Sequence, residues 1–372
     1  MPKKLIVLHI LPNLSRGGAE RVCVEILKNL DKEKFSPVLL LFKENGSGEE
    51  MKLELKKANV PVFAIKKLAL IDPINFGQII KVIKTIKPDI VHTHLGGDIY
   101  GRLAAKILKI PIIVSTEHNL NRSEKKKATW LKKITAAWTH KIFAVSQAVR
   151  EDAILRYKLK PEQITVLYNG IDTNLYTSSN ISNRLYNDNN SNKIIIGALG
   201  RLSSQKGFMS LIEAAAKTKN KNYLIEIAGE GELEGELKKR IKELELINRV
   251  RLVGRVEAKS FLAKIDIFIF TSLWEGLGLA ILEAGAMGKP IIASQIGGVR
   301  EILNEDNAFL FPAGDDDEIA EKIDFVLNNL NSQEVKNKIE TTSKIIKEKF
   351  ELSDMVKKYA NWYEKLFIQR DN

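Results

Sequence analysis

The chain has 372 residues, a hydrophobic content of 44% and a formal net charge of +12 at pH 7. Its length exceeds that of a single ordinary core, so two domains are expected. No uninterrupted apolar run approaches the ~20 residues of a membrane-spanning helix, which argues against an integral membrane protein. The single cysteine, Cys23, excludes a disulfide-stapled scaffold and favours a reducing compartment.

The positive charge is confined to the first half of the chain. Residues 1–175 carry 30 Lys and Arg against 17 Asp and Glu, a balance of +13, whereas the remaining residues carry 28 against 29, a balance of −1. Such asymmetry indicates an anionic partner, either a membrane surface or a nucleic acid. A nucleic acid would require base-stacking aromatic residues within the basic region, and because only two Trp residues qualify, we expect no nucleic acid partner.

Strand-like and helix-like segments alternate along this first half. The expected strands are Lys4–Leu11, Phe35–Phe42, Val60–Ile65, Asp89–His94, Ile110–Thr116 and Lys141–Val145. The expected helices are Gly17–Leu30, Gly48–Ala58, Phe76–Ile86, Ile99–Leu108 and Gln147–Tyr157. This alternation is typical of an α/β domain whose parallel sheet is covered on both faces.

The loop between the first strand and the first helix reads Ser15-Arg16-Gly17-Gly18-Ala19-Glu20. Glycines at this place allow the backbone to approach a phosphate, and the helix N-terminus supplies N–H donors. Tight turns use glycine for other reasons, so Gly17 and Gly18 are weak evidence by themselves. No Gly-x-Gly-x-x-Gly follows Leu11, which argues against a nicotinamide-dependent dehydrogenase.

Two histidines follow strand ends, where ligand-binding side chains collect in parallel sheets. His118 comes just after the strand in IIVSTEHN, and we predict a functional role for it. His94 ends the strand in VHTHLGG, and it could line an acceptor site or be structural. His92 and His94 share a strand face, but no acidic or Cys cluster completes a metal set, so no metal is expected there. His9 lies in an apolar strand and is predicted to be in the core.

Residues 124–141, EKKKATWLKKITAAWTHK, read as a basic amphipathic helix. Its apolar side chains are predicted to share one face, flanked by lysines. A helix of this type suits a membrane interface that contains anionic lipid. The alternative is an ordinary helix whose apolar stripe packs on the sheet. The apolar residues are Trp130, Leu131, Ile134, Ala137 and Trp138, and the lysines are Lys125, Lys126, Lys127, Lys132 and Lys133.

A segment rich in Asn and Ser separates the two halves, and the strand pattern restarts at Ile194. Its composition cannot bury a core, so we expect a linker or surface loop there. Further strands are expected at Tyr223–Ala228, Arg249–Val253, Asp266–Phe270 and Pro290–Ala293. The domain prediction is therefore a first domain at 1–175, a linker at 176–193 and a second domain at 194–352.

The segment ALGRLSSQKGF contains two cations, Arg201 and Lys206, between a strand and a helix that begins near Phe208. Fixed positive charge and the helix dipole act together there, so the pair suits a diphosphate. Two solvated surface cations are the alternative, and the strand–loop–helix context makes us prefer the diphosphate site. Asp315-Asp316-Asp317 instead reads as a loop and the N-terminus of a helix, where Asp is favoured.

Ser272–Gly288, SLWEGLGLAILEAGAMG, places Glu275 and Glu283 on either side of a glycine turn and an apolar run. The buried strand before it and the helix after it would direct free backbone N–H groups at an anion or at sugar hydroxyls. Carboxylates offer several acceptor sites, which suits them to bind the hydroxyls of a sugar or a ribose. Two surface glutamates on a helix would be the ordinary alternative.

This last segment resembles the Glu-x7-Glu signature of retaining family 4 glycosyltransferases, whose usual form is close to SxxEGFGLPxLEAMAxGxPV. Leu277 replaces the usual Phe, and Ala280 replaces the usual Pro. GRLSSQKG is similar to the diphosphate clamp of that family, and the Gly17-Gly18 loop is similar to its GGxER opening. The resemblance implies a GT-B fold of two Rossmann-like domains facing across a cleft. It also implies a C-terminal helix, at about 353–372, that crosses back to the first domain.

The resemblance also assigns roles to individual residues. Arg201 and Lys206 would clamp the diphosphate, Glu275 would bind the donor sugar or stabilise positive charge at the anomeric carbon, and His118 would contact the transferred sugar. Glu283 would bind the ribose. The implied catalytic residues are His118, Arg201, Lys206 and Glu275; the donor site is Gly17, Gly18, Arg201, Lys206, Gly276, Leu277, Gly278, Leu279 and Glu283; and the acceptor-side candidates are Arg16 and His94.

The function expected from these observations is retaining transfer of a hexosyl or N-acetylhexosaminyl group from a nucleotide sugar, without a metal or other cofactor. A UDP-sugar is favoured over a GDP-sugar, and the acceptor is expected to be a lipid-linked or cell-surface glycan precursor. We expect a cytoplasmic location, with residues 124–141 placing the protein on the inner face of the cytoplasmic membrane. A GT-B-like epimerase or phosphorylase, or a nucleotide-sugar-binding protein without catalysis, are the alternatives.

Overall fold

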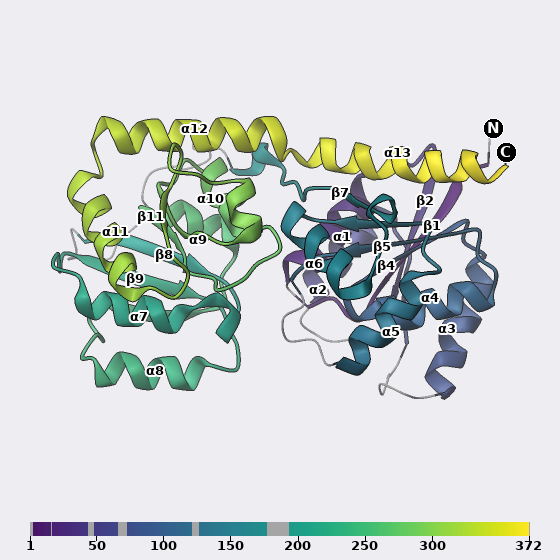
Figure 1. Cartoon of the computed structure of the whole chain (residues 1–372), viewed down its shortest axis with the longest axis horizontal. Helices are drawn as coiled ribbons and strands as arrows, with labels where there is room; N and C mark the ends of the chain where they lie inside the picture. The colour runs from purple at the N-terminus through teal and green to yellow at the C-terminus, as the bar shows by residue number, and fades with distance from the viewer. Residues whose placement is uncertain are drawn as a thin grey trace. The chain divides into compact units, whose positions relative to one another are not determined.

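The structure is a computed structural model that describes residues 3–15, 17–43, 48–65, 73–120, 126–176 and 193–371. The chain divides into two compact units (Figure 1). Unit 1 comprises Met1–Gly170 and Leu352–Asn372, and unit 2 comprises Ile171–Glu351. Each unit contains one parallel sheet with helices interleaved along the chain, as the alternation of strand and helix signals predicts.

The sheet of unit 1 has seven strands in the order β3-β2-β1-β4-β5-β6-β7. All neighbouring strands pair in parallel. The order reverses between β1 and β4, which is the place where sheets of this type bind ligands. The strands are β1 Leu5–Leu11, β2 Phe35–Leu41, β3 Val62–Ala64, β4 Ile90–His94, β5 Ile112–Glu117, β6 Lys141–Ala144 and β7 Ile164–Val166.

Helices cover this sheet on both faces, and the two faces of β1 differ in character. Leu8 and Ile10 point into an apolar cluster that includes α3 and α4, whereas His9 alternates to the face that carries α1 and α13. The helices of unit 1 are α1 Gly18–Asn29, α2 Glu49–Lys57, α3 Pro73–Ile86, α4 Asp98–Ile107, α5 Lys126–Ala136, α6 Gln147–Tyr157 and α13 Leu352–Asp371.

The C-terminal helix α13 is part of unit 1 although its sequence follows unit 2. It packs against α1 and places Tyr359 and Tyr363, both fully buried, against the sheet. At the surface, Lys34 donates to Glu364 at 2.8 Å. Two buried aromatic side chains and an ion pair therefore fasten the last helix to the first domain of the sequence.

Unit 2 contains a six-stranded sheet in the order β10-β9-β8-β11-β12-β13, again with parallel pairing throughout. Its order reverses between β8 and β11. The strands are β8 Ile194–Leu199, β9 Tyr223–Ala228, β10 Val250–Gly254, β11 Ile267–Phe270, β12 Ile291–Ser294 and β13 Phe309–Phe311. The helices are α7 Phe208–Lys217, α8 Glu234–Glu243, α9 Ala258–Lys264, α10 Leu279–Ala286, α11 Asp316–Asn329 and α12 Gln333–Lys349.

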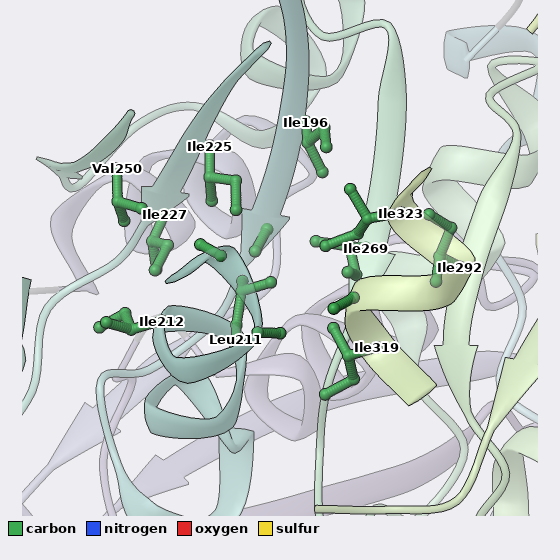
Figure 2. Packing of buried hydrophobic residues seen from close by; sticks show 14 of the residues in the cluster. Ile196, Leu211, Ile212, Ile225, Ile227, Val250, Ile269, Ile292, Ile319 and Ile323 are labelled. Carbon is green, nitrogen blue, oxygen red and sulfur yellow. The ribbon is translucent and has the colours of Figure 1, made fainter. Parts of the chain in front are cut away.

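The core of unit 2 is formed by mainly aliphatic side chains, with a few aromatic ones, between the sheet and the helices α7, α8 and α11. Figure 2 shows strand residues facing the residues of two helices. Continuous burial of this kind explains why the strands read as uninterrupted apolar runs. The labelled residues are Ile196, Leu211, Ile212, Ile225, Ile227, Val250, Ile269, Ile292, Ile319 and Ile323.

The structure adds two strands that the sequence did not indicate, β7 and β13, each of three residues. The Asp315 side chain accepts from the Glu318 backbone N–H at 3.1 Å, which confirms the start of a helix at this acidic run. Of the expected linker, residues 177–192 lie outside the described residues. None of the described helices is long and apolar enough to cross a membrane.

Candidate active-site residues in the two units

In unit 2, the candidate residues gather where the strand order reverses. Arg201 follows β8, and Glu275 follows β11, its neighbour in the sheet. The loop after β8 forms a short 3₁₀ turn, Ser204–Lys206, before α7 begins at Phe208. This is the carboxyl end of the sheet at its switch point, the usual ligand position in open α/β sheets.

The structure brings Lys206 and Glu275 into direct contact. The Lys206 ammonium donates to Glu275 Oε2, and both side chains are less than one-fifth exposed. Gln205 donates from Nε2 to Glu275 Oε1 at 3.3 Å and to the Trp274 carbonyl at 3.0 Å. Gln205 was not predicted as a site residue, and its only signal in the sequence was its position in the same strand–helix loop as Lys206. The result is a cation and a carboxylate held by the loops of two neighbouring strands.

Two glycines allow these loops to approach each other. Gly207 has φ +62°, and a Cβ there would collide with the Thr271 carbonyl oxygen. A Cβ at Gly298, in the loop after β12, would collide with the Gly276 carbonyl oxygen. Only glycine fits such contacts without moving the backbone. These two glycines therefore serve close packing of the loops that carry Lys206 and Glu275.

The glycine turn after Glu275 leads directly into a helix. Gly278 has φ +94° and precedes α10, which begins at Leu279, and no side chain caps this N-terminus. Leu277 is buried, with 2% of its surface exposed. The first N–H groups of such a helix favour an anion or an acceptor oxygen. Donor binding at 276–279 remains a prediction.

Arg201 and Glu283 have other partners in this structure. The Arg201 side chain is 74% exposed, and its Nη2 lies 3.3 Å from Glu232 Oε2. Tyr176 donates its hydroxyl to Glu283 Oε1 at 3.1 Å. Tyr176 was not predicted as a site residue, because it lies at the edge of a segment that reads as linker. A clamp formed by both Arg201 and Lys206 remains a prediction.

In unit 1, His94 and His118 lie at the ends of β4 and β5 and contact each other. His94 Nδ1 and His118 Nε2 are 3.0 Å apart. His118 is 9% exposed, and burial lowers its pKa to about 4, with Glu117 opposing this shift and Lys132 adding to it. His118 is therefore a neutral imidazole at neutral pH. His9 is fully buried in the core, as predicted.

Four charged side chains are buried beside His118. Asp98 Oδ1 and Glu117 Oε1 each lie 3.6 Å from Arg102 Nη2, and the Lys132 ammonium is 3.8 Å from Asp98 and 3.9 Å from Glu117. Burial raises the pKa of Asp98 to about 6, while the cation Arg102 acts in the opposite direction. Two cations and two carboxyls thus balance in a region that water does not reach.

The start of α1 in unit 1 contains a buried acid, Glu20. Gly17 precedes α1, which begins at Gly18, and the loop residue Ser15 donates its hydroxyl to Glu20. Glu20 is 6% exposed and touches the position that a Gly17 Cβ would occupy. Burial raises the pKa of Glu20. A carboxyl therefore lies at the helix N-terminus that we expected to receive a phosphate. The other candidate there, Arg16, lies outside the described residues.

Helix α5 differs from its prediction. It covers Lys126–Ala136, so Ala137 and Trp138 follow the helix, and Lys125 lies outside the described residues. Lys132 was expected on the solvent face and is instead buried, because it pairs with Asp98 and Glu117. Trp130 is 60% exposed. The apolar stripe does not pack on the sheet through Trp130, and the buried side is formed by Lys132, Thr135 and Ala136.

Comparisons with known proteins agree with this arrangement. The family described as "Glycosyltransferase Family 4" matches residues 16–175, and "Glycosyl transferases group 1" matches residues 182–344. The chain is 29% identical to the UDP-Gal:alpha-D-GlcNAc-diphosphoundecaprenol alpha-1,3-galactosyltransferase of Escherichia coli, over 95% of this chain and 96% of that protein.

Solved glycosyltransferase structures share the fold over nearly the full length. A glycosyltransferase from Rickettsia africae ESF-5 has a TM-score of 0.83 at 24% identity, covering 98% of both chains. Anabaena HepE in complex with UDP and glucose has a TM-score of 0.85 at 23% identity, covering 97% of this chain and 100% of that chain. The two family matches, placed on the two units, show that this chain is a GT-B glycosyltransferase and belongs to glycosyltransferase family 4.

Proposed function

We propose that this protein transfers a hexosyl or N-acetylhexosaminyl group from a UDP-sugar to a hydroxyl of a lipid-linked or cell-surface glycan precursor, with retention of anomeric configuration. The observation that carries the proposal is the contact between Lys206 and Glu275 at the switch point of the sheet in unit 2. A cation beside the start of α7 suits a diphosphate, and a carboxylate before the uncapped start of α10 suits sugar hydroxyls.

The transfer needs no metal in this proposal, because cationic side chains replace it. The bond between the anomeric carbon and the diphosphate oxygen breaks while the bond to the acceptor oxygen forms on the same face of the sugar. The proton of the acceptor hydroxyl passes to the departing diphosphate. Lys206 and Arg201 stabilise the charge that develops on that diphosphate. Glu275 binds the donor sugar, Glu283 binds the ribose, and His118 contacts the transferred sugar.

The names of related proteins support the substrate classes. The Escherichia coli relative uses UDP-Gal and an acceptor linked to diphosphoundecaprenol, and the Anabaena structure contains UDP and glucose. We therefore favour UDP-sugars over GDP-sugars and a lipid-linked acceptor over a soluble one. His94 and Arg16 are the acceptor-side candidates.

The experiment combines a thermal-shift screen with a transfer assay. A nucleotide sugar present at 100 times its dissociation constant should stabilise the protein by about 2.7 kcal/mol. UDP-galactose, UDP-glucose and UDP-N-acetylglucosamine would be compared with GDP-mannose. The positive donors would then be incubated with a polyprenyl-diphosphate-linked sugar, and the anomeric configuration of the product would be read by NMR. Binding without transfer or donor hydrolysis would contradict an enzyme, and an inverted product would contradict retention.

We further propose that α5 places the protein on the inner, cytoplasmic face of an anionic membrane. The exposed residues of α5 include Lys126, Lys127, Lys133, Trp130 and Ile134. Lysines beside exposed aromatic and aliphatic side chains are the composition of an interfacial helix. Such a position would bring the enzyme to a lipid-linked acceptor.

A further inference from the structure

A continuous chain of buried polar side chains runs through unit 1 from His118 to the C-terminal helix. We call this set the histidine chain. Every member lies within unit 1, on β1, β4, β5 or α13 or directly after β5. In order, its atom pairs are His118 Nε2 to His94 Nδ1, 3.0 Å; His94 Nε2 to His9 Nδ1, 3.0 Å; His9 Nε2 to Tyr363 Oη, 3.3 Å; Tyr363 Oη to His92 Nδ1, 2.6 Å; His92 Nε2 to Thr116 Oγ1, 2.8 Å; and Thr116 Oγ1 to Tyr359 Oη, 3.3 Å.

The register of the sheet explains why these residues meet. His9 pairs with His92 across β1 and β4, and His94 pairs with Thr116 across β4 and β5. Residues opposite one another in register point to the same face, here the face that carries α13. Tyr363 then closes the chain from above, because its hydroxyl lies between His9 and His92.

All four histidines of the chain are uncharged at neutral pH. Burial lowers the pKa of His9 to about 3 and of His118 to about 4, and it lowers the pKa of His92 and His94 well below the usual value. A neutral imidazole has one N–H donor and one acceptor nitrogen. Where both nitrogens of a ring have partners, the ring must donate on one side and accept on the other.

The chain therefore has two self-consistent proton arrangements. In the first, every histidine carries its proton on Nε2. Each member then donates a hydrogen bond to the next, from His118 through His94 to Thr116 and Tyr359. In the second, every histidine carries its proton on Nδ1, and the direction runs from Tyr359 to His118. A mixed arrangement would leave a buried donor unpaired, or would place two protons or two lone pairs in one contact, which is costly in an interior.

The two ends of the histidine chain differ in whether an unpaired hydrogen-bond donor can be accommodated there. Among the described residues, Thr116 is the one hydrogen-bond partner that the structure gives the Tyr359 hydroxyl, and Tyr359 is fully buried. If each member of the histidine chain donated to the next from His118 towards Tyr359, the hydroxyl hydrogen of Tyr359 would have no acceptor among the described residues. At the other end, His118 Nδ1 is a buried atom to which no described residue gives a hydrogen-bond partner, and His118 is the residue that contacts the sugar in the proposed function. An unpaired donor is tolerable at that end, because a bound substrate oxygen can accept from it.

We propose that the histidine chain holds His118 as the Nδ1–H tautomer, ready to donate a hydrogen bond to an oxygen of the bound sugar, and that Tyr363 of α13 is a positioning residue for His118. This inference rests on the proposed function for the identity of the ligand oxygen, and on the hydrogen-bond geometry of unit 1 for the tautomer. It gives the C-terminal helix a role in the chemistry of a residue on a different element.

Metal binding is the competing use of these histidines. The ligand atoms of His9, His92 and His94 all lie within 4.8 Å of one another, and the Cys23 sulfur is 3.5 Å from His9 Nδ1. A metal would require an unshared lone pair from each ring, directed at one point. Every ring nitrogen of these three residues instead has a hydrogen-bond partner, and those of His92 face Tyr363 and Thr116. The hydrogen-bonded chain is the arrangement that fits.

NMR of the protein labelled with ¹⁵N in its histidine rings tests the tautomers directly. The proposal expects His9, His92, His94 and His118 all to be protonated on Nδ1. His140 supplies an internal reference of opposite type, because its Nδ1 accepts from the Ile113 backbone N–H at 3.1 Å and its proton must be on Nε2. Four Nε2–H tautomers in the chain, or signals of rings bound to zinc in the purified protein, would overturn the proposal.

Two variants test the direction and its consequence. Tyr363→Phe keeps the packed ring but removes the link between His92 and His9, so we expect Nε2–H tautomers to appear at His9, His94 and His118. The kcat should fall roughly tenfold with little change in donor KM, since a positioned side chain contributes about 10²-fold or more and only part of this is lost. Tyr359→Phe removes the donor that sets the direction and should mix the tautomers of all four rings.

Tyr223→Phe is the matched control. Tyr223 is fully buried in unit 2, and its hydroxyl lies 2.6 Å from Thr218 Oγ1, so the variant loses a comparable buried hydroxyl outside the chain. It should leave the histidine signals and kcat unchanged. Histidine signals in Tyr363→Phe identical to those of the wild type would overturn the proposal. If no nucleotide sugar is used as a donor but the four Nδ1–H signals are present, the proposed function fails and the tautomer assignment stands.

Discussion

The two units use the same sheet architecture with different interiors. In unit 2 the core is hydrophobic, and the candidate site residues are on loops beyond the strand ends. In unit 1, histidine and threonine side chains on one face of the central strands bond to one another and to the tyrosines of α13. All five histidines of the sequence are in residues 1–140, and none is in unit 2.

In unit 2 the residues proposed for function are separate from the core, whereas in unit 1 the same residues contribute to stability and to function. Lys206 and Glu275 are on loops beyond the strand ends of unit 2, so we expect that either can be changed without disrupting the core. A residue of the histidine chain contributes both to the interior of unit 1 and to the orientation of His118. Partly satisfied buried polar networks are costly, so changes there should affect folding as well as turnover.

The largest expected effect is acid destabilisation of unit 1. The pKa of His9 is lowered to about 3 and that of His118 to about 4, and those of His92 and His94 are also lowered, whereas the unfolded residues titrate near 6.5. The unfolded state therefore binds more protons, and stability present above pH 6.5 is lost as the pH falls towards 4. Each group contributes about 1.4 kcal/mol per pH unit in that window.

Glu20 and Asp98 act in the opposite sense, because burial raises the pKa of both carboxyls. The folded pKa of Asp98, about 6, lies above its usual 3.8, so its contribution is complete below pH 3.8 and is lost as the pH rises through 6. Hydrogen exchange with mass spectrometry, corrected for intrinsic rates, should show unit 1 losing protection before unit 2 between pH 6.5 and 4.5. Equal loss in both units would contradict the contrast between their interiors.

The second effect concerns the proposed clamp in unit 2. Lys206→Ala should lower kcat/KM by about 10²–10³-fold, the cost of about 2.7–4 kcal/mol for one preorganised donor in a transition state. Arg201→Ala should have a similar effect if both cations bind the diphosphate. Lys217→Ala removes another ion pair of unit 2, to Asp316 and Asp317, and serves as the control. Unchanged turnover in Lys206→Ala or Arg201→Ala would remove that residue from the mechanism.

The third effect tests the site residue of unit 1. His118→Ala should lower kcat by roughly 10²-fold, with a smaller change in donor KM, because an interaction made mainly in the transition state appears in kcat. His140→Ala is the matched control, since His140 is exposed and bonds to a backbone N–H outside the histidine chain. A raised donor KM at equal kcat would make His118 a binding residue.

The fourth effect is weaker and concerns the surface of unit 1. Exchanging Lys126, Lys127 and Lys133 for Gln should reduce binding to anionic liposomes by roughly 1 kcal/mol per residue, without changing the melting temperature. The same exchange at Lys238, Lys239 and Lys242 of α8 removes equal charge from unit 2 and should have little effect. Wild-type binding should rise with the anionic lipid fraction and fall with salt. Failure of the wild-type protein to float with anionic liposomes would favour a soluble acceptor.

The smallest expected effect is that of a chelator. Because cationic side chains replace a metal in the proposed mechanism, excess EDTA should leave the transfer rate unchanged. The Asp315–Asp317 run caps α11, and two of its carboxylates pair with Lys217, so it is committed to a helix start. Strict dependence on Mn²⁺ or Mg²⁺ would contradict the clamp mechanism and would make Asp315–Asp317 the candidate metal site.

Much of the fold follows from local sequence patterns. Continuous apolar strands such as Ile267–Phe270 and regular helical spacing predict parallel sheets, because both patterns depend on neighbours in the chain. The short strands β7 and β13 were not predicted, although β3, which is equally short, was. The burial of Lys132 was also missed, because it depends on two carboxyls from other elements.

The sequence by itself determined the family, the α/β class and the strand-end positions of Lys206, Glu275 and His118, because motifs and periods are local properties. Tertiary structure alone decided which side chains touch. It placed Gln205 beside Glu275 and Tyr176 beside Glu283, and it inserted Tyr363 between histidines that are more than 270 residues earlier in the chain. Contacts over such separations depend on sheet register and on where the last helix packs, and no local pattern encodes either of these.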